Sequence, residues 1–277
     1  MNKNYEYEKT KPVDLIYILG AGHCGSTLLS LCLDQHKSVV GLSEIITLNR
    51  KSPGWSGSKF VLSDHFWSEV NRDMRERFSE RLTEVPFNLR QSLPYYDLAI
   101  QRNKVALESI LNISGKSIIC DSSKDSKRLD VLLGSKLFKV KVIYLVRDGR
   151  AIVHSYRRKY GSWLPGWFNL TRTDRAARQL KNKYGSDNWL TVRYEDMVSD
   201  LEGSLVKICN FAGINFDSNM LNPDTSDFNG LGGNNLLNRP IDSIKLDTAW
   251  KTEMPTMVRI FTSATVLSYN RRYGYKN

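Results

Sequence analysis

The chain has 277 residues, of which 41% are hydrophobic, and 40 Lys and Arg against 29 Asp and Glu give it a formal net charge of +11. This balance is typical of a globular protein with a sizeable core and excludes a disordered, collagen-like or fibrous chain. The surplus of positive charge indicates an anionic partner, which is a nucleic acid, a membrane surface or a phosphorylated small molecule.

The N-terminus and the cysteines bear on whether the protein is secreted, spans a membrane or contains disulfides. The polar start MNKNYEYEKTKP has no apolar segment typical of a signal peptide, and no run of about 18 apolar residues occurs. The cysteines are scattered and form no C-x-x-C pair, which favours reduced thiols over a disulfide framework (Cys24, Cys32, Cys120 and Cys209). The histidines have no metal-ligand spacing. We therefore expect a cytoplasmic protein that binds neither membrane nor metal.

Short apolar runs and helical patterns alternate along the chain. In its first half we expect strands at 14–20, 38–42 and 116–121, helices at 26–36, 66–83, 95–113 and 127–134, and a loop at 50–62. In its second half we expect strands at 139–147 and 189–194, helices at 148–160, 172–184, 201–212 and 255–269, and a long loop at 215–240. This alternation predicts one α/β domain over residues 1–277 with a mainly parallel sheet, whose ligands bind beyond the carboxyl ends of the strands.

A glycine-rich loop follows the first predicted strand. From Gly20 to Thr27 the chain reads G-x-x-x-x-G-S-T, the spacing of a phosphate-binding Walker A loop, with Ser26 in place of its lysine. Glycines let backbone N–H groups surround an anion at the start of a helix, and that does not require the lysine. The missing lysine disfavours hydrolysis of ATP or GTP. A simple glycine turn between strand and helix is the alternative interpretation.

A second anion site is predicted at the end of the strand 139–147. Arg147 follows this strand directly, and Ser155 and Lys159 lie one turn apart on one face of the next helix. Together these groups could hold a phosphate by forked and single-point contacts. A basic surface helix is the alternative, and it suits Arg157 and Arg158. Two anion sites on one sheet predict a nucleotide phosphorylated at both ends of its ribose.

These motifs resemble those of the sulfotransferases that use 3′-phosphoadenylyl sulfate (PAPS), and most closely those of tyrosylprotein sulfotransferases and bacterial relatives. The first loop is similar to the family's 5′-phosphosulfate loop, and R-D-G-R-A-x-x-H-S from Arg147 is similar to its 3′-phosphate motif. D-S-S-K ending at Lys124, R-Y-E-D-M from Arg193 and a late G-G-N…R-P-I-D…W ending at Trp250 extend the resemblance over residues 15–250. It implies a three-layer, P-loop-like α/β fold.

The resemblance also implies a role for each matching residue. The 5′-phosphosulfate of PAPS would be held by Gly22, His23, Cys24, Gly25, Ser26 and Thr27. The 3′-phosphate would be held by Arg147 and Ser155 with help from Lys159, while Tyr194 would lie near the adenine and Arg239 would close over the phosphates. Core packing is the alternative for Tyr194. No metal is implied.

Three residues are the candidates for catalysis. Glu44 follows a strand and would take the proton of the acceptor, although it could instead cap a helix. Lys124 would stabilise charge on the transferring group, with Lys127 as its rival. His23 stands where the family has Arg or Lys, and it either fills that basic position or contacts the acceptor.

The implied reaction is transfer of a sulfonyl group from PAPS to a hydroxyl, or an amine, of a small-molecule acceptor. A P-loop nucleotide kinase and a nucleic-acid- or polyanion-binding protein are the alternatives, and no recognised nucleic-acid motif is present. Residues 147–183 hold ten Lys and Arg against two Asp, so an anionic acceptor is one candidate. The sequence identifies neither the acceptor nor the oligomeric state.

Overall fold

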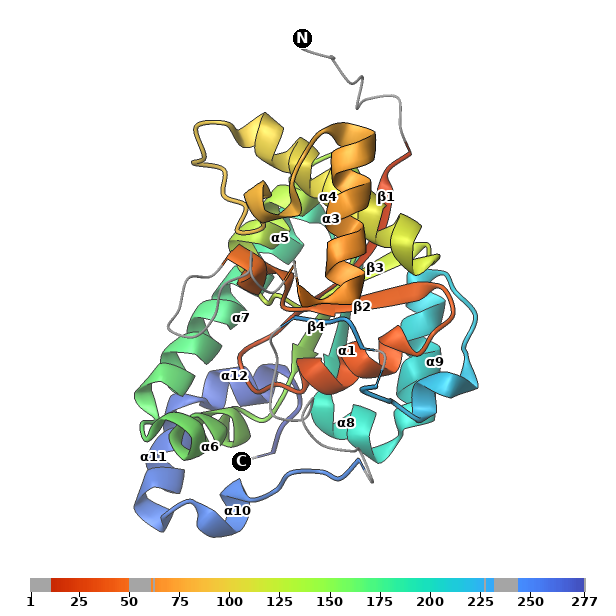
Figure 1. Cartoon of the computed structure of the whole chain (residues 1–277). Helices are drawn as coiled ribbons and strands as arrows, with labels where there is room; N and C mark the ends of the chain where they lie inside the picture. Colours follow the sequence, from red (N-terminus) through yellow and green to blue (C-terminus); the bar gives the residue numbers. More distant parts are fainter. Residues whose placement is uncertain (1–10, 50–60, 62, 227, 232–243, 277) are drawn as a thin grey trace.

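A five-stranded parallel sheet forms the centre of the computed structural model, which describes residues 11–49, 61, 63–226, 228–231 and 244–276. The strands follow the order β2-β3-β1-β4-β5 (Figure 1). They are β1 (Val13–Leu19), β2 (Val39–Ser43), β3 (Ile118–Asp121), β4 (Phe138–Val146) and β5 (Trp189–Arg193). All four pairings are parallel, and Leu15 of β1 lies between Ile119 of β3 and Val140 of β4. The predicted α/β architecture is confirmed.

Both faces of the sheet are buried, because successive side chains of the central strands are apolar and point to opposite faces. On β1, Leu15, Tyr17 and Leu19 belong to one hydrophobic cluster, whereas Ile16 and Ile18 belong to a second cluster on the opposite face. Strand β4 divides in the same way. Continuous apolar strands of this kind are typical of a parallel sheet that is covered by helices on both sides.

The helices form the two outer layers. The second cluster packs the sheet against α1 (Ser26–Asp34), α8 (Tyr194–Ser199) and α9 (Leu201–Ala212). The first cluster packs it against α3 (His65–Phe78), α4 (Tyr96–Ser114), α5 (Ser126–Gly134), α6 (Gly149–Tyr160), α7 (Leu164–Tyr184) and α12 (Leu267–Arg272). Helices α10 (Trp250–Glu253) and α11 (Thr256–Thr265) lie beside α6 (Figure 1). Short 3-10 helices span Ile45–Asn49, Leu82–Glu84 and Ser218–Leu221.

Several helices differ from the prediction. Helix α3, predicted over 66–83, ends at Phe78, where Ser79 has a left-handed φ of 56°, and the short helices α8 and α10 were not predicted. Helix α7 begins at Leu164 rather than at residue 172, because Pro165 occupies its first turn, where a missing N–H costs nothing. The predicted helix 255–269 is two helices, α11 and α12, which are separated at Val266. The loop predicted at 50–62 lies almost entirely outside the described residues, and the one at 215–240 lies partly outside them.

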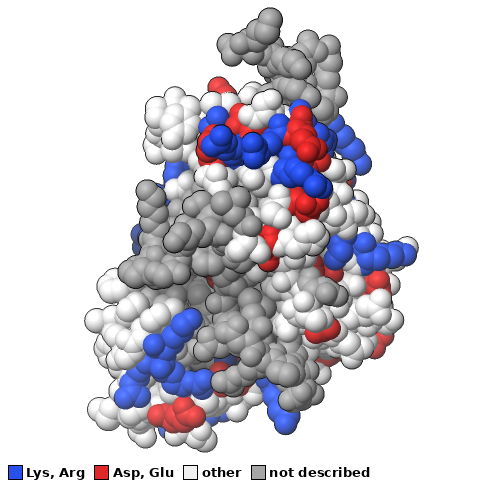
Figure 2. Space-filling model, viewed as in Figure 1, with Lys and Arg blue, Asp and Glu red and all other residues white. Residues whose placement is uncertain are grey.

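The surface charge is not uniform. Lys, Arg, Asp and Glu are mixed over α3 in the upper part of Figure 2, as expected of a solvated helix face. Lysine and arginine also gather at the lower left, over the region of α6, with an acidic group directly below them. The last turn of α6 carries Arg157, Arg158 and Lys159. Among the described residues, none of the helices has the length and apolar character needed to cross a bilayer.

Candidate active site

One cavity of about 530 Å³ lies at the carboxyl edge of the sheet. Each of the five strands ends in a segment that lines it, which is where parallel sheets bind ligands. These segments contribute the loop after β1, Glu44 after β2, Lys124 after β3, Arg147 after β4 and Tyr194 after β5. Other lining residues come from α6, α7 and the stretch before α10: Ser155, Tyr156, Arg158, Lys159, Tyr160, Asn169, Ile244, Lys245 and Asp247.

The loop after β1 has the backbone of a cradle. Gly25 has a φ of 99°, and a Cβ there would lie 2.4 Å from the Tyr194 ring. A Cβ on Gly22 would lie 2.2 Å from the Tyr156 hydroxyl, so both positions require glycine. The Gly22 N–H donates to Asn169 Oδ1 at 2.8 Å. Helix α1 begins at Ser26, directly after Gly25. The first amides of this helix lack acceptors within it and can therefore bind an anion.

Lys124 joins this loop to Glu44. Its Nζ donates to Glu44 Oε1 at 2.6 Å, to Ser26 Oγ at 3.2 Å and to the Ser122 carbonyl oxygen at 3.2 Å. The Glu44–Lys124 ion pair is mostly buried, with 23% and 15% of the two side chains exposed. A cation from the β3 loop therefore contacts Ser26, the residue that stands at the Walker lysine position.

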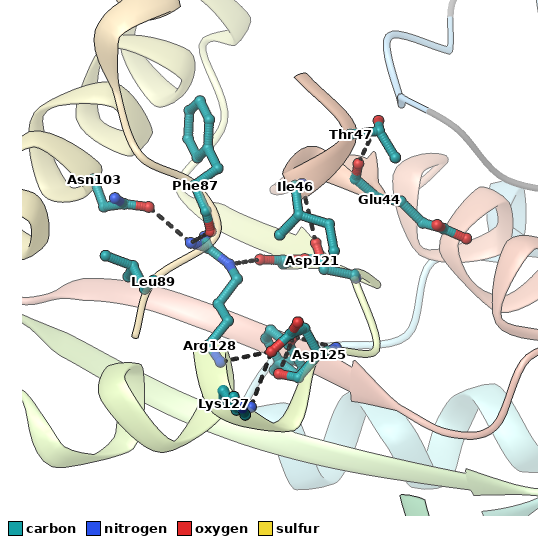
Figure 3. Close-up of polar contacts among 12 residues, drawn as sticks. Glu44, Ile46, Thr47, Phe87, Leu89, Asn103, Asp121, Asp125, Lys127 and Arg128 are labelled. Atoms are coloured by element: carbon teal, nitrogen blue, oxygen red, sulfur yellow. Dashed lines mark hydrogen bonds and ion pairs between the residues drawn. The ribbon is translucent and has the colours of Figure 1, made fainter. Parts of the chain in front are cut away.

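A buried network fixes the turn that carries Lys124. Figure 3 shows Arg128 pointing between Asp121, Asn103 and the Phe87 carbonyl, with distances of 2.8, 2.7 and 2.8 Å. The other Asp121 oxygen accepts the Ser123 N–H at 2.8 Å. Lys124 itself has a left-handed φ of 57°, which costs a non-glycine residue about 1 kcal/mol and persists only when its neighbours hold it.

The residue after Lys124 is held as firmly. The hydroxyl of buried Tyr17 donates to the Asp125 carbonyl at 2.9 Å and accepts the Asp125 N–H at 3.0 Å. The Asp125 carboxylate caps α5 and accepts hydrogen bonds from both terminal nitrogens of Arg90, at 3.1 and 2.8 Å. Lys124 thus lies between two fixed residues.

Arg147 is buried at the other end of the cavity, with 7% of its side chain exposed. Its Nη1 donates to the His23 carbonyl at 2.9 Å, and its guanidinium lies 4.6 Å from the centre of the Tyr194 ring. Its Nη2 donates to the Asp247 carboxylate at 3.1 Å and to the Asp247 carbonyl at 3.2 Å. Its Nε is buried without a hydrogen-bond partner among the described residues.

Helix α12 holds the turn that begins at Arg147. The Tyr269 hydroxyl donates to the Arg147 carbonyl at 3.1 Å. The Asn270 side chain accepts the Gly149 N–H at 2.9 Å and donates to Asp148 at 3.1 Å. Helix α12 therefore supports the cavity although none of its side chains lines it.

His23 is uncharged at neutral pH in this cavity. Burial, and then the charges of Lys159, Arg147 and Lys124, lower the pKa of His23 to about 4. Its ring meets the Tyr156 ring edge-on, with centroids 4.8 Å apart. Among the described residues of the cavity, the positive charge comes from lysine and arginine rather than from histidine.

The cavity gathers most of the residues singled out by the sequence. Eleven of them line it: Gly22, His23, Gly25, Ser26, Thr27, Glu44, Lys124, Arg147, Ser155, Lys159 and Tyr194. Cys24 does not line the cavity, because its side chain is wholly buried in the second cluster, and its N–H bonds to the Ala21 carbonyl. Arg239 lies outside the described residues. Lys127 is exposed and does not line the cavity, unlike Lys124.

The sequence reading missed several lining residues. Tyr156, Asn169 and Asp247 line the cavity although no motif in the sequence points to them. Asn169 reaches Gly22 across 147 residues of sequence, and Asp247 reaches Arg147 across 100. Since Asn169 lies on α7 ahead of the predicted start of that helix, a correct helix boundary would have been the one available signal.

Comparisons with known proteins agree with this fold. A family model described as "Sulfotransferase family" matches residues 14–218. The sulfotransferase domain of the Synechococcus PCC 7002 olefin synthase is 23% identical, with a TM-score of 0.64 over 99% of this chain and 100% of that domain. The sulfotransferase domain from the curacin biosynthetic pathway is 19% identical, with a TM-score of 0.62 over 96% and 99%. Sulfotransferase STF9 from Mycobacterium avium is 13% identical, with a TM-score of 0.59 over 98% and 79%. These structural likenesses show a shared fold.

Proposed function

Since the chain belongs to the sulfotransferase family, we propose that it transfers a sulfonyl group from PAPS to a hydroxyl of a small-molecule acceptor, with an amine as the alternative acceptor group. The observation that carries this proposal is that both predicted anion sites lie in one cavity. The glycine-rich loop and Arg147 are joined there by the bond from Arg147 Nη1 to the His23 carbonyl, at 2.9 Å.

The lining residues fit a nucleotide with two phosphate groups. The loop has no room for a Cβ at Gly22 or Gly25, and the first amides of α1, which lack acceptors within the helix, can bind an anion. At the other end, the buried Nε of Arg147 has no partner among the described residues, although such groups are normally hydrogen-bonded. Bound PAPS would supply the sulfonyl group and the leaving nucleotide.

The chain's own residues then bind and orient the nucleotide. The loop from Gly22 to Thr27 would hold the 5′-phosphosulfate through backbone N–H groups and the two hydroxyls of Ser26 and Thr27. Arg147 and Ser155 would hold the 3′-phosphate, with Lys159 as a further cation, and Tyr194 would lie beside the adenine. Arg239, as a phosphate ligand, remains an expectation from the sequence.

Glu44 and Lys124 would carry the proton and charge movements. Glu44 would accept the proton of the acceptor hydroxyl as that oxygen becomes a nucleophile. Lys124, fixed against Ser26 at 3.2 Å, would stabilise negative charge that develops at the loop. His23, which is neutral here, would contact the acceptor or the 5′-phosphate through its ring nitrogens. Such transfers depend mainly on positioning and charge stabilisation.

The acceptor would approach beside α6. Tyr156, Tyr160 and Lys159 line the cavity on this side, and the last turn of α6 is basic and exposed. A small acceptor with a ring and an anionic group fits this combination of aromatic and positively charged side chains.

Thermal stabilisation tests the proposal, since a ligand that binds only the folded chain raises its melting temperature. We expect adenosine 3′,5′-bisphosphate (PAP) to stabilise the chain, and ATP with Mg²⁺ or an oligonucleotide to have little effect. Arg147→Ala should abolish the response to PAP, whereas Arg157→Ala, on the exposed side of α6, should retain it. A strong response to ATP with Mg²⁺ and none to PAP would refute the proposal.

A further inference from the structure

Asp247 places a carboxylate beside the arginine that is proposed to bind the 3′-phosphate. Its Oδ2 lies 3.1 Å from Arg147 Nη2, and its Oδ1 lies 3.8 Å from Arg158 Nη1. Its side chain is 37% exposed, and it lines the same cavity as Ser155 and Lys159. A negative group therefore stands among the cations that would hold the phosphate.

The Asp247 carboxylate uses only one of the two nitrogens on one edge of the Arg147 guanidinium. The Nε and Nη2 atoms form one edge of a guanidinium and can bind two oxygens of one phosphate group. In this structure Nη2 is bonded to Asp247, whereas Nε is buried without a partner among the described residues. A carboxylate held mainly at one nitrogen is a smaller substitute for a phosphate that would use both.

Asp247 is ionised in this position. Burial alone would raise the pKa of its carboxyl group, but the Ala249 N–H and the Arg147 guanidinium outweigh burial and hold that pKa below its usual value. The carboxylate and a 3′-phosphate are thus both anions that need the same guanidinium, and they would repel each other if both were bound to it.

We propose that Asp247 competes with the 3′-phosphate for Arg147, gives way when the nucleotide binds, and returns to Arg147 as PAP leaves. This inference rests on the proposed function, because it assumes that the ligand carries a 3′-phosphate. It makes Asp247 a residue that lowers affinity for nucleotides with a 3′-phosphate and speeds their release, while nucleotides without that group are unaffected.

The variant Asp247→Asn removes the negative charge of the side chain and can keep its other contacts. The amide oxygen can still accept the Ala249 N–H, which Asp247 Oδ1 accepts at 3.1 Å, and the Asp247 carbonyl can still accept from Arg147. The matched control is Glu253→Gln, which removes a negative charge from nearby α10, where the side chain is 55% exposed and does not line the cavity.

The test compares PAP with adenosine 5′-monophosphate, which lacks the 3′-phosphate, by calorimetric titration and stopped-flow release. We expect Asp247→Asn to bind PAP about three- to tenfold more tightly, mainly through slower release, and to bind the monophosphate within about twofold of the unaltered chain. Glu253→Gln should change neither affinity by more than about twofold.

The possible outcomes separate the two claims. Unchanged or weaker PAP binding by Asp247→Asn, or an equal gain for both nucleotides, would overturn the role of Asp247 and leave the proposed function intact. If the unaltered chain binds PAP no better than the monophosphate, the proposed function fails at its 3′-phosphate site and the inference is overturned with it.

Discussion

Replacing Tyr17 by Phe tests how the fold positions Lys124. The substitution keeps the buried ring and removes only the hydroxyl, which bonds to both the N–H and the carbonyl of Asp125. Burial raises the pKa of Tyr17 well above its usual value, so this hydroxyl keeps the proton it donates. Each lost bond costs about 1 kcal/mol, and we expect the free energy of unfolding to fall by about 2 kcal/mol. At the scale for a chain of this size, the melting temperature falls by about 5 °C.

The effect on Lys124 is separable from the effect on stability. Loosening Asp125 removes one of the two restraints on the left-handed turn at Lys124, so its Nζ is less firmly held against Ser26 and Glu44. We expect sulfonyl transfer to slow by about tenfold, the loss of a 1.4 kcal/mol contribution, while PAP affinity stays within about twofold.

The control variant removes another tyrosine hydroxyl that bonds to α5. The hydroxyl of Tyr184, on α7, shares its proton between the Asp130 carbonyl at 3.0 Å and the Asp130 carboxylate at 2.7 Å, beyond Asp125 along α5. Tyr184→Phe should lower stability without slowing transfer. In a Lys124→Ala background, Tyr17→Phe should have no further effect on the rate. An equal loss of rate in both tyrosine variants, or a loss that persists without Lys124, would refute the reasoning.

Two further predictions concern buried charge. Arg128→Met leaves the Asp121 carboxylate buried without its cation, so it should lower the free energy of unfolding by about 3–5 kcal/mol in denaturant titrations, and a change below about 1 kcal/mol would contradict this. The pKa of His23 is lowered to about 4 in the folded chain, so the unfolded chain binds more protons between that value and its usual pKa of about 6.5. Stability should therefore fall as the pH falls from about 6.5 towards 4, and His23→Gln should weaken this dependence, whereas an identical pH profile for the variant would contradict the assignment.

The sequence predicted the sheet and the strand ends well, for identifiable reasons. Strand β4 ends in a continuous apolar run, Val142–Val146, that is buried on both faces, and Arg147 follows it directly, so the strand and its adjacent ligand site could be predicted together. The turns at Gly25 and Gly213 also marked their helices correctly, since both glycines have positive φ values.

What the sequence could not show was contact across long separations. The ion pair between Glu44 and Lys124 joins segments 80 residues apart, and no local pattern predicts it. Arg128 resembles a surface arginine in the sequence but is wholly buried. The early start of α7 was missed because Leu164-Pro165-Gly166 has the composition of a turn, and packing of Gly166 against Tyr156 explains how a glycine is accommodated in that helix.

A crystal structure of the chain with PAP tests the central claim most directly. The account predicts the 5′-phosphate on the backbone of the loop from Gly22 to Thr27 and the 3′-phosphate on Arg147 and Ser155, with the Asp247 carboxylate displaced from Arg147. A nucleotide bound in the opposite direction, or bound outside this cavity, would contradict it.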